Sequence, residues 1–139
     1  MLRRRDDRIE HLRVIRALSA CSDRELADVA RLSDEVTLPR RCVLMREGAI
    51  GHECFLVLEG HADVRIGGRH TARLGPGDII GEMAILDREP RSATVVATTP
   101  LRALVMTELQ FAAVCDHCPT VARKVMQLLA HRLREIQAA

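Results

Sequence analysis

Two side chains of opposite charge lie close together in the stretch GDIIGEMAILDREPRSATV, residues Gly77–Val95. Glu82 stands among small and apolar residues, and Arg91 follows a polar turn. A guanidinium offers a planar fork of N–H donors to two phosphate oxygens, whereas an ionised carboxylate accepts hydrogen bonds from hydroxyl groups. The pair can therefore hold a ligand that is anionic at one end and hydroxylated at the other.

The spacing of Glu82 and Arg91 leaves a second interpretation open, because the two can also form an ion pair on the surface, worth about 1 kcal/mol or less. The ligand interpretation predicts a short helical turn over Gly81–Leu86, whose free N–H groups and positive end attract an anion. Gly81 and Ala84 are small enough to let a phosphate come close. A ribose hydroxyl beside a phosphate would then satisfy Glu82 and Arg91 together.

Many short strands are expected around this stretch, because apolar runs alternate with glycine-rich turns. The expected strands lie in EVTLP, RCVLMREG, ECFLVLEG, HADVRIGGRHTARLG, RSATVVAT and LRALVMT. Gly67-Gly68 predicts a tight hairpin, and Gly75-Pro76-Gly77 predicts a second turn. Such closely spaced strands favour a sandwich or a roll over a parallel sheet with helical crossovers.

Helices are expected on both sides of the strands. A first amphipathic helix is indicated by four apolar residues at every third position: Ile9, Leu12, Ile15 and Leu18. The segment SDRE, Ser22–Glu25, is a capping box that begins a second helix, with a buried stripe of Leu26, Val29 and Ala30. A short helix over Glu108–Cys115 and a long one that begins at Pro119 follow the strands.

The last helix carries two apolar stripes. One has the four- and three-residue spacing of a coiled-coil seam: Ala122, Met126, Leu129, Leu133 and Ile136. The neighbouring stripe is Val121, Val125 and Leu128. One stripe would be enough to dock the helix on its own domain. Two stripes leave two alternatives open. Either both stripes face one core, or the helix also pairs in parallel with its twin in a homodimer.

The composition is that of a single soluble domain of 139 residues, with 47% hydrophobic and 29% charged residues. The net charge of +2 is too small to indicate a nucleic-acid surface, and two Phe with no Trp or Tyr disfavour base stacking. Arg3–Arg5 are balanced by Asp6 and Asp7, which predicts a solvated helix start. Because no apolar run is long enough to cross a bilayer, we expect a cytoplasmic protein without membrane contact.

The opening stretch resembles the phosphate-binding cassette of the cyclic-nucleotide-binding domain family, which includes the sensor domains of bacterial catabolite activators and of kinase regulatory subunits. The family pattern is G-E, a small or apolar residue, A/G-L, a few variable residues, then R-[S/T/A]-A. This sequence has GEMAIL at Gly81–Leu86 and RSATV at Arg91–Val95. REGAIGHECFLVLEGHADV is similar to the family's hairpin, and LSACSDRELADVARL to its N-terminal helical segment, so nearly the whole chain is covered.

The resemblance implies a mainly β architecture, a double-stranded β-helix (a jelly-roll-like β-roll) flanked by helices. A single cyclic-nucleotide-binding domain would cover residues 1–139. It would have N-terminal helices over 1–34, a β-roll over 35–106 with the cassette at 81–93, and a hinge and C-terminal helix over 107–139.

The ligand implied by the resemblance is a 3′,5′-cyclic nucleotide, with cAMP preferred and cGMP left open. Glu82 would take the ribose 2′-hydroxyl and Arg91 the cyclic phosphate. The other implied nucleotide-binding residues are Gly81, Met83, Ala84, Ser92 and Ala93, with Val64 and Leu74 as walls for the base. The last helix would move to cover the base through Arg132, Ile136 or Gln137, and this movement would signal that the ligand is bound. No further cofactor is implied.

Two features depart from the family pattern. Cys54-Phe55 stands where aromatic pairs are frequent, so the back wall of the pocket would pack differently. The chain stops soon after the last helix, so no winged-helix domain and no direct DNA binding are expected. A degenerate member that serves as an interaction module without nucleotide is therefore one alternative to the sensor.

A metal-dependent, cupin-like enzyme is the other alternative. LGPGDIIGE faintly resembles part of a cupin motif, and the β region holds possible ligands at His52, Glu53, His61 and His70. The His-x-His pair expected of such a site is missing, so we expect no metal. No Ser-His-Asp or Cys-His arrangement can be assembled either, and catalysis is not expected.

The five cysteines, at irregular spacing, indicate reduced thiols. Cys115 and Cys118 have zinc-ligand spacing, with His117 between them, but no second pair follows. We expect two thiols at a helix junction. Because Cys118 precedes Pro119 at a helix start, where the pKa of a thiol tends to fall, a redox role is conceivable.

Overall fold

The computed structural model of the chain describes residues 9–10, 12–13, 15 and 18–138. In α3 and α5 it leaves undescribed the side chains of Met83, Ala84, Leu86, Arg132, Ile136 and Ala138. The chain divides into two compact units: residues 33–111 form one, and residues up to 32 with those from 112 onward form the other. Arg3–Arg5 and the helix start expected there lie outside the described residues.

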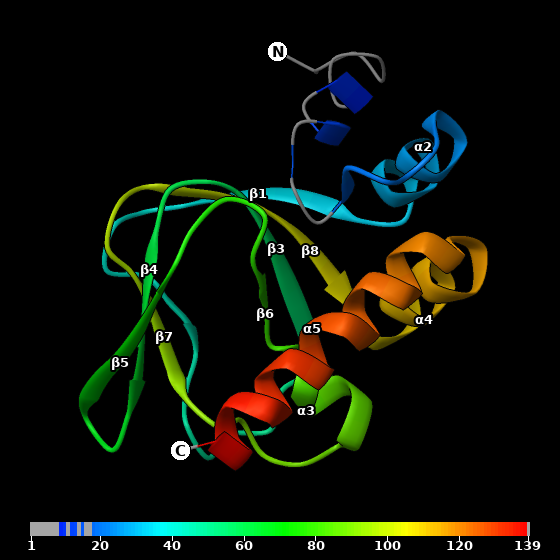
Figure 1. Cartoon of the computed structure of the whole chain (residues 1–139). Helices are drawn as coiled ribbons and strands as arrows, with labels where there is room; N and C mark the ends of the chain where they lie inside the picture. The colour runs from blue at the N-terminus through cyan, green and yellow to red at the C-terminus, as the bar shows by residue number, and fades with distance from the viewer. Residues whose placement is uncertain (1–8, 11, 14, 16–17, 139) are drawn as a thin grey trace. The chain divides into compact units, whose positions relative to one another are not determined.

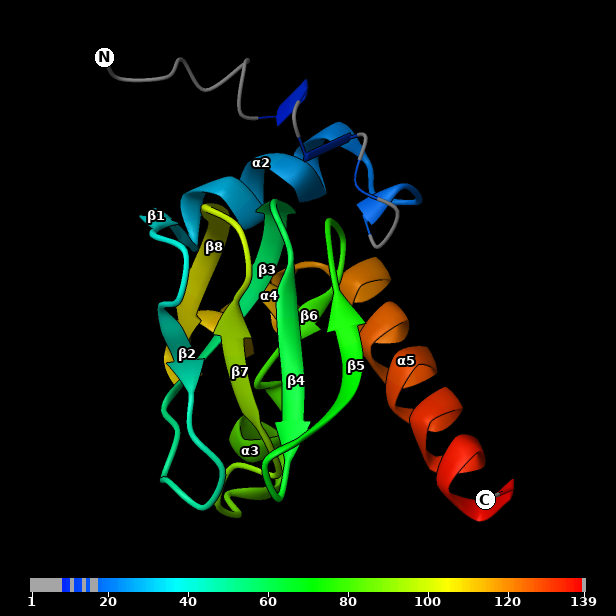
Figure 2. The ribbon, with the colours of Figure 1, turned by 90° about the vertical axis from the view of Figure 1, so that its left-hand side faces the viewer.

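Two four-stranded antiparallel sheets make up the unit of residues 33–111 (Figure 1). The first sheet has the order β1 (Asp34–Leu38), β8 (Leu101–Thr107), β3 (Glu53–Glu59) and β6 (Ile79–Ile80). The second has the order β2 (Val43–Met45), β7 (Thr94–Ala97), β4 (Ala62–Ile66) and β5 (Arg69–Leu74). Figure 2 shows the second sheet nearest the viewer, with its strands side by side in this order. The expected β-roll is therefore present.

Apolar side chains from both sheets form the core of the roll. In β3, five successive residues from Cys54 to Leu58 are buried between exposed glutamates at the two ends. Burying a side chain such as Val57 contributes about 1.5–3 kcal/mol to folding. The buried core consists of Leu44, Phe55, Val57, Ala62, Ile80, Val95, Ala97, Leu101 and Ala103.

The hairpin expected at Gly67-Gly68 joins β4 to β5. Both glycines have a positive φ, 59° and 77°, which matches the turn that a two-residue hairpin requires. The turn at Gly75–Gly77 is also present, and the Asp78 carboxylate accepts a hydrogen bond of 2.8 Å from the Gly75 N–H. The expected strands are thus confirmed, and β6 is a strand that the sequence did not predict.

The helical unit contains α2 (Asp23–Arg31) and α5 (Pro119–Ala138), and α4 (Glu108–His117) leads into it. The capping box is confirmed: the Glu25 N–H donates to Ser22 Oγ at 3.2 Å, and the Ser22 N–H donates to Glu25 Oε1 at 3.1 Å. Residues 9–10 and 12–13 are helical, whereas other parts of the first expected helix lie outside the described residues. None of the helices in the described ranges is long and apolar enough to cross a bilayer.

The first turn of α5 is joined to α2 through Glu25. The Thr120 N–H donates to Glu25 Oε2 at 3.3 Å, and the Thr120 hydroxyl donates to Glu25 Oε1 at 3.0 Å. Burial by itself would raise the pKa of Glu25, but the hydrogen bonds from Ser22 and Thr120 outweigh it and lower that pKa. The carboxylate of Glu25 therefore caps both helices.

The two stripes of α5 differ in exposure. Val121 and Val125 are buried, whereas Met126 and Leu133 are 62% and 56% exposed. The alternative in which both stripes face one core is therefore wrong for Met126 and Leu133. Ala122, Leu128 and Leu129 are partly buried, and the side chain of Ile136 is not described.

Candidate functional site

The expected helical turn is present as α3 (Glu82–Asp87), at one end of the two sheets (Figure 2). Gly81 precedes it with a φ of 88°, a left-handed conformation that glycine adopts without steric cost. Arg88 ends the helix, also left-handed. Glu82 is thus the first residue of a helix that begins immediately after strand β6.

The side chain of Arg91 returns across this loop, as the spacing predicted. Its Nη1 donates to the Gly81 carbonyl at 2.8 Å, and its Nη2 donates to the Glu53 carbonyl at 2.6 Å. The backbone of Arg91 is fixed as well, because its N–H donates to the Ala49 carbonyl and its carbonyl accepts from the Gly48 N–H, each at 2.8 Å. The guanidinium is therefore held between the start of α3 and the start of β3.

Both charged side chains are buried: Glu82 is 3% exposed and Arg91 is 5% exposed. The interpretation of the two as a surface ion pair is therefore wrong. In the described part of the chain, Arg91 forms no salt bridge with a carboxylate, and its side chain donates only to neutral carbonyl groups. A buried cation without a counter-ion is costly, so an anion placed beside this guanidinium would offset that cost.

Two glycines make room for the guanidinium of Arg91. A Cβ placed on Gly51 would overlap Nε, Cζ and Nη2 of Arg91, and one on Gly81 would overlap Nη1. Sequence reasoning found Gly81 from the motif but missed Gly51 and the carbonyl of Glu53. The segment EGAIG offered only a weak signal, because a backbone acceptor has no side-chain signature.

Arg91 also lines a pocket of about 360 Å³ next to β2 and the loop that follows it. The other lining residues are Val43–Arg46 and Ala49–Glu53. Glu82, Val64 and Leu74 are not among them, so this pocket does not bring all the expected site residues together.

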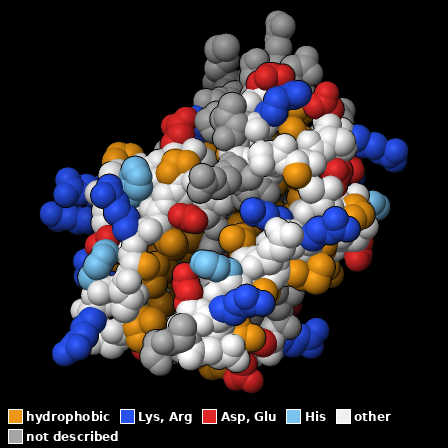
Figure 3. Space-filling view, viewed as in Figure 1, with side chains coloured by type: hydrophobic (Ala, Val, Ile, Leu, Met, Phe, Trp, Pro, Cys, Tyr) orange, Lys and Arg blue, Asp and Glu red, His pale blue; other side chains and the backbone are white. Residues whose placement is uncertain are grey.

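The expected walls for a base lie on β4 and β5. Val64 and Leu74 are partly buried and pack against the core, and the register pairs Leu74 with Ala62 and Val64 with Val95. Farther along β4, Ile66 is 47% exposed. Figure 3 shows hydrophobic side chains open to view in the β-rich part of the chain, between the strands labelled β4 and β6 in Figure 1. An apolar surface is thus available inside the roll.

The remaining expected site residues are placed as follows. Ser92 is exposed, and Ala93 is 4% exposed in the segment before β7. Met83 and Ala84 lie in α3, but their side chains are not described. Among the expected caps on α5, Gln137 is exposed, and the side chains of Arg132 and Ile136 are not described.

The two thiols at the helix junction have raised pKa values. Burial, reinforced by the negative charges of Asp28 and Glu25, raises the pKa of Cys118 to about 11. Burial and Asp116 also raise the pKa of Cys115. The expectation of a lowered thiol pKa is therefore wrong, because burial outweighs the helix start. No group of three His, Cys, Asp or Glu side chains that could hold a metal occurs among the described residues.

Comparison with known proteins gives the family of the chain. The sequence profile of the cyclic nucleotide-binding domain matches residues 35–118, more than half of the chain. The chain belongs to the cyclic nucleotide-binding domain family. The matched region contains strands β2 to β8, all of β1 except Asp34, the loop with α3, and Arg91.

Relatives of this cyclic nucleotide-binding domain occur in larger bacterial proteins. The Pycsar effector protein PaPycTIR of Pseudomonas aeruginosa is 36% identical over 113 residues, which cover 81% of the chain and 36% of that protein. The cyclic AMP receptor protein of Thermus thermophilus is 35% identical over 102 residues, 70% of the chain and 47% of that protein. The chain thus spans between a third and a half of the length of these two relatives.

The fold is confirmed by a solved structure. The catabolite activator protein of Thermus thermophilus superimposes with a TM-score of 0.80 and 29% identity, over 88% of this chain and 60% of that one. The β-roll with flanking helices that the resemblance implied is therefore the fold of this domain.

Proposed function

We propose that this chain is a sensor module that binds a 3′,5′-cyclic nucleotide in its β-roll, with cAMP as the preferred ligand. The observation that carries the proposal is the guanidinium of Arg91, which is 5% exposed and has no carboxylate partner among the described residues. A cyclic phosphate carries one negative charge and supplies the missing counter-ion. Because the guanidinium is already fixed by two carbonyl groups, the ligand would not have to order it.

Glu82 would distinguish the sugar from the phosphate. Its carboxylate would repel a phosphate, so its contact with the ligand must be a donor, and the ribose 2′-hydroxyl is the donor nearest to a 3′,5′-cyclic phosphate. Gly81, which accepts a hydrogen bond from Arg91, directly precedes Glu82, so the two charged groups act at adjacent points of one loop. The N–H groups of Met83, Ala84 and Ala93 would add donors to the phosphate, and the Ser92 hydroxyl would assist them.

The base would lie against Val64 and Leu74, which are only partly buried in the roll. The preference for cAMP is supported by the relative from Thermus thermophilus whose name is cyclic AMP receptor protein. We expect the signal to be a movement of α5 over the base through Arg132, Ile136 or Gln137. A ligand drives such a movement only as far as it binds the closed state more tightly than the open one.

A calorimetric titration of the purified chain with cAMP, cGMP and 5′-AMP tests this proposal. We expect saturable binding of cAMP at one site, weaker binding of cGMP, and the weakest binding of 5′-AMP, whose phosphate is not cyclic. The alternative of a degenerate interaction module predicts no heat with any of the three nucleotides. That outcome would contradict the sensor function and would leave the fold as the only part of the prediction that holds.

The role of Glu82 can be tested separately with a ligand that lacks the hydroxyl. We expect Glu82→Gln to weaken binding of cAMP by about 1.5–3 kcal/mol, because the charged acceptor of the 2′-hydroxyl is lost. The same variant should bind 2′-deoxy-cAMP nearly as the unchanged chain does. Equal losses with both ligands would show that Glu82 acts on something other than the ribose hydroxyl.

A further inference from the structure

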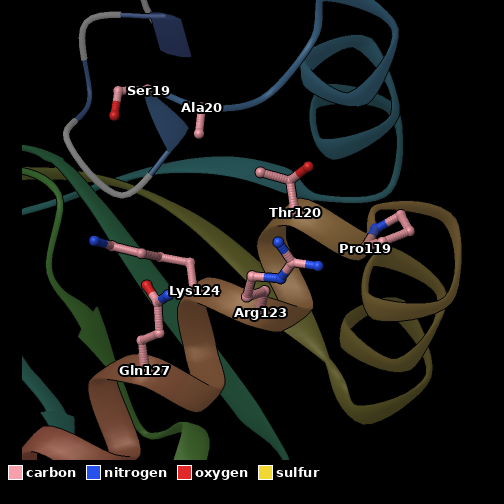
Figure 4. Close-up of a pocket in the computed structure, with 7 residues that line it drawn as sticks. All are labelled: Ser19, Ala20, Pro119, Thr120, Arg123, Lys124 and Gln127. Atoms are coloured by element: carbon pink, nitrogen blue, oxygen red, sulfur yellow. The ribbon is translucent and has the colours of Figure 1, made fainter.

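A second pocket, of about 280 Å³, lies in the helical unit and shares no residue with the nucleotide site (Figure 4). One of its walls is α5, and the other contains Ser19 and Ala20. The α5 residues lie three and four positions apart, so they occupy one face of the helix: Thr120, Arg123, Lys124 and Gln127. In Figure 4 the side chains of Arg123 and Lys124 lie on the side of α5 that faces the segment with Ser19 and Ala20.

Two positively charged side chains line this pocket, and neither has an ion-pair partner in the part of the chain that the structure describes. Arg123 is exposed and Lys124 is partly buried, and neither has a hydrogen bond or an ion pair with another residue in the described ranges. The acidic residue that contacts the pocket wall is Glu25, through Thr120. Its two carboxylate oxygens already accept from the Ser22 N–H, the Thr120 N–H and the Thr120 hydroxyl.

The other two acidic residues of α2 have ion-pair partners of their own. Asp23 pairs with Arg13 at 2.8 Å, and Asp28 pairs with Arg31 at 3.2 Å. The charges of Asp23 and Asp28 are therefore offset by arginines, and Glu25 alone of these three carboxylates faces the two positive charges of Arg123 and Lys124 without a cationic partner of its own. The two cations and the Gln127 amide line one hollow. On a solvated basic helix face, the cations would instead point separately into the solvent.

We propose that this pocket binds phosphate, either as the free ion or as the phosphoryl group of a small molecule, between Arg123 and Lys124. The guanidinium fork suits two oxygens of a phosphate, the ammonium suits a third, and the Gln127 amide offers a further donor. The volume of about 280 Å³ lies just below the range of about 300–1,000 Å³ for small-molecule sites. A phosphate with a small organic part fits this space.

Lys124 can be labelled selectively to test the proposal, because it is the only lysine of the sequence. Reductive methylation with ¹³C-formaldehyde keeps its charge and labels only Lys124 and the terminal amine. The labelled chain is titrated with inorganic phosphate and then with glycerol phosphate, at constant ionic strength against chloride, because exposed charges are screened by salt. A parallel titration of an unmethylated sample follows the backbone amides of Thr120 and Gln127.

We expect a saturable shift of the Lys124 methyl signal and of both amides, with no comparable shift of the terminal amine. Arg123→Gln should weaken phosphate binding about tenfold or more. The control is Arg134→Gln, because Arg134 is exposed on the same helix and does not line the pocket. Tighter binding of glycerol phosphate would identify a phosphorylated small molecule, and equal binding would identify the free ion.

The proposal is overturned if no saturation occurs, or if Arg134→Gln weakens binding as much as Arg123→Gln does. Its outcome is separate from that of the nucleotide site. Arg91→Ala should weaken the binding of cyclic nucleotide and leave the response of Lys124 to phosphate unchanged.

Discussion

Gly51 leaves the space that the guanidinium of Arg91 occupies, and Gly81 supplies the carbonyl that accepts one of its N–H groups. A methyl group on Gly51 would have to displace the guanidinium. We therefore expect Gly51→Ala to weaken cyclic-nucleotide binding about tenfold or more while the chain stays folded, since misplacing the charge removes its contact with the phosphate. Calorimetry measures the affinity, and circular dichroism checks the fold.

The same substitution in an Arg91→Ala background separates a positioning role from a merely structural one. If Gly51 acts through Arg91, Gly51→Ala causes little further loss in that background, because the side chain that it displaces is gone. A loss of the same size in both backgrounds would contradict the positioning role.

At the residue scale, the sequence predicted the charged side chains of the site but not the groups that hold Arg91 in place. Glu82 and Arg91 could be found because their side chains have opposite and specific hydrogen-bonding capacities. Gly51 and Glu53 could not, because one contributes empty space and the other a backbone carbonyl. The burial of the two charges also depends on strands far apart in the sequence.

At the scale of elements, Glu25 joins the starts of α2 and α5, and this joint should respond to pH. The lowered pKa of Glu25 means that folding favours its charged form. The stabilisation is therefore complete above the ordinary glutamate pKa of 4.5 and is lost as the pH falls through the lowered value. We expect Glu25→Gln to reduce the free energy of unfolding by about 1–2 kcal/mol near neutral pH.

Urea unfolding near neutral pH and below the lowered pKa measures this effect. The unchanged chain should lose more stability on acidification than Glu25→Gln does. Glu89→Gln is the matched control, because Glu89 is exposed in the loop after α3 and its side chain forms no hydrogen bond or ion pair within the described ranges. If both variants lose as much stability on acidification as the unchanged chain does, Glu25 is not the source of this pH dependence.

Local signals predicted most elements correctly. The capping box at Ser22–Glu25 and the hairpin at Gly67-Gly68 depend on residues next to one another, so the sequence reveals them. Strand β6 was missed because Ile79 and Ile80 are both buried and show no alternation. It exists because the two residues pair with Leu56 and Phe55 of β3, a contact between distant segments.

At the scale of the whole molecule, the exposed stripe of α5 predicts association of two copies. Met126 and Leu133 of the stripe with seam spacing are exposed, whereas Val121 and Val125 are buried, so these two side chains remain available for a second helix. We expect the chain to be a dimer at micromolar concentration and the double variant Met126→Lys, Leu133→Lys to be a monomer, as measured by sedimentation equilibrium.

Leu109→Lys provides the control for this experiment, because Leu109 is 84% exposed but lies on α4. It should leave the association state unchanged. A monomeric unchanged chain would contradict the pairing of α5. The sequence left two alternatives for this helix, since the burial of each stripe depends on the fold as a whole.

We infer that the buried guanidinium of Arg91 binds the phosphate of a cyclic nucleotide. The test of this claim is a calorimetric titration of cAMP into the unchanged chain, Arg91→Lys and Arg91→Ala. We expect one saturable site in the unchanged chain and a loss of about 2–5 kcal/mol in Arg91→Ala, because the anion would be buried without its partner. Arg91→Lys, which keeps the charge but not the fork, should fall between the two. Equal affinity of the unchanged chain and Arg91→Ala would contradict the claim.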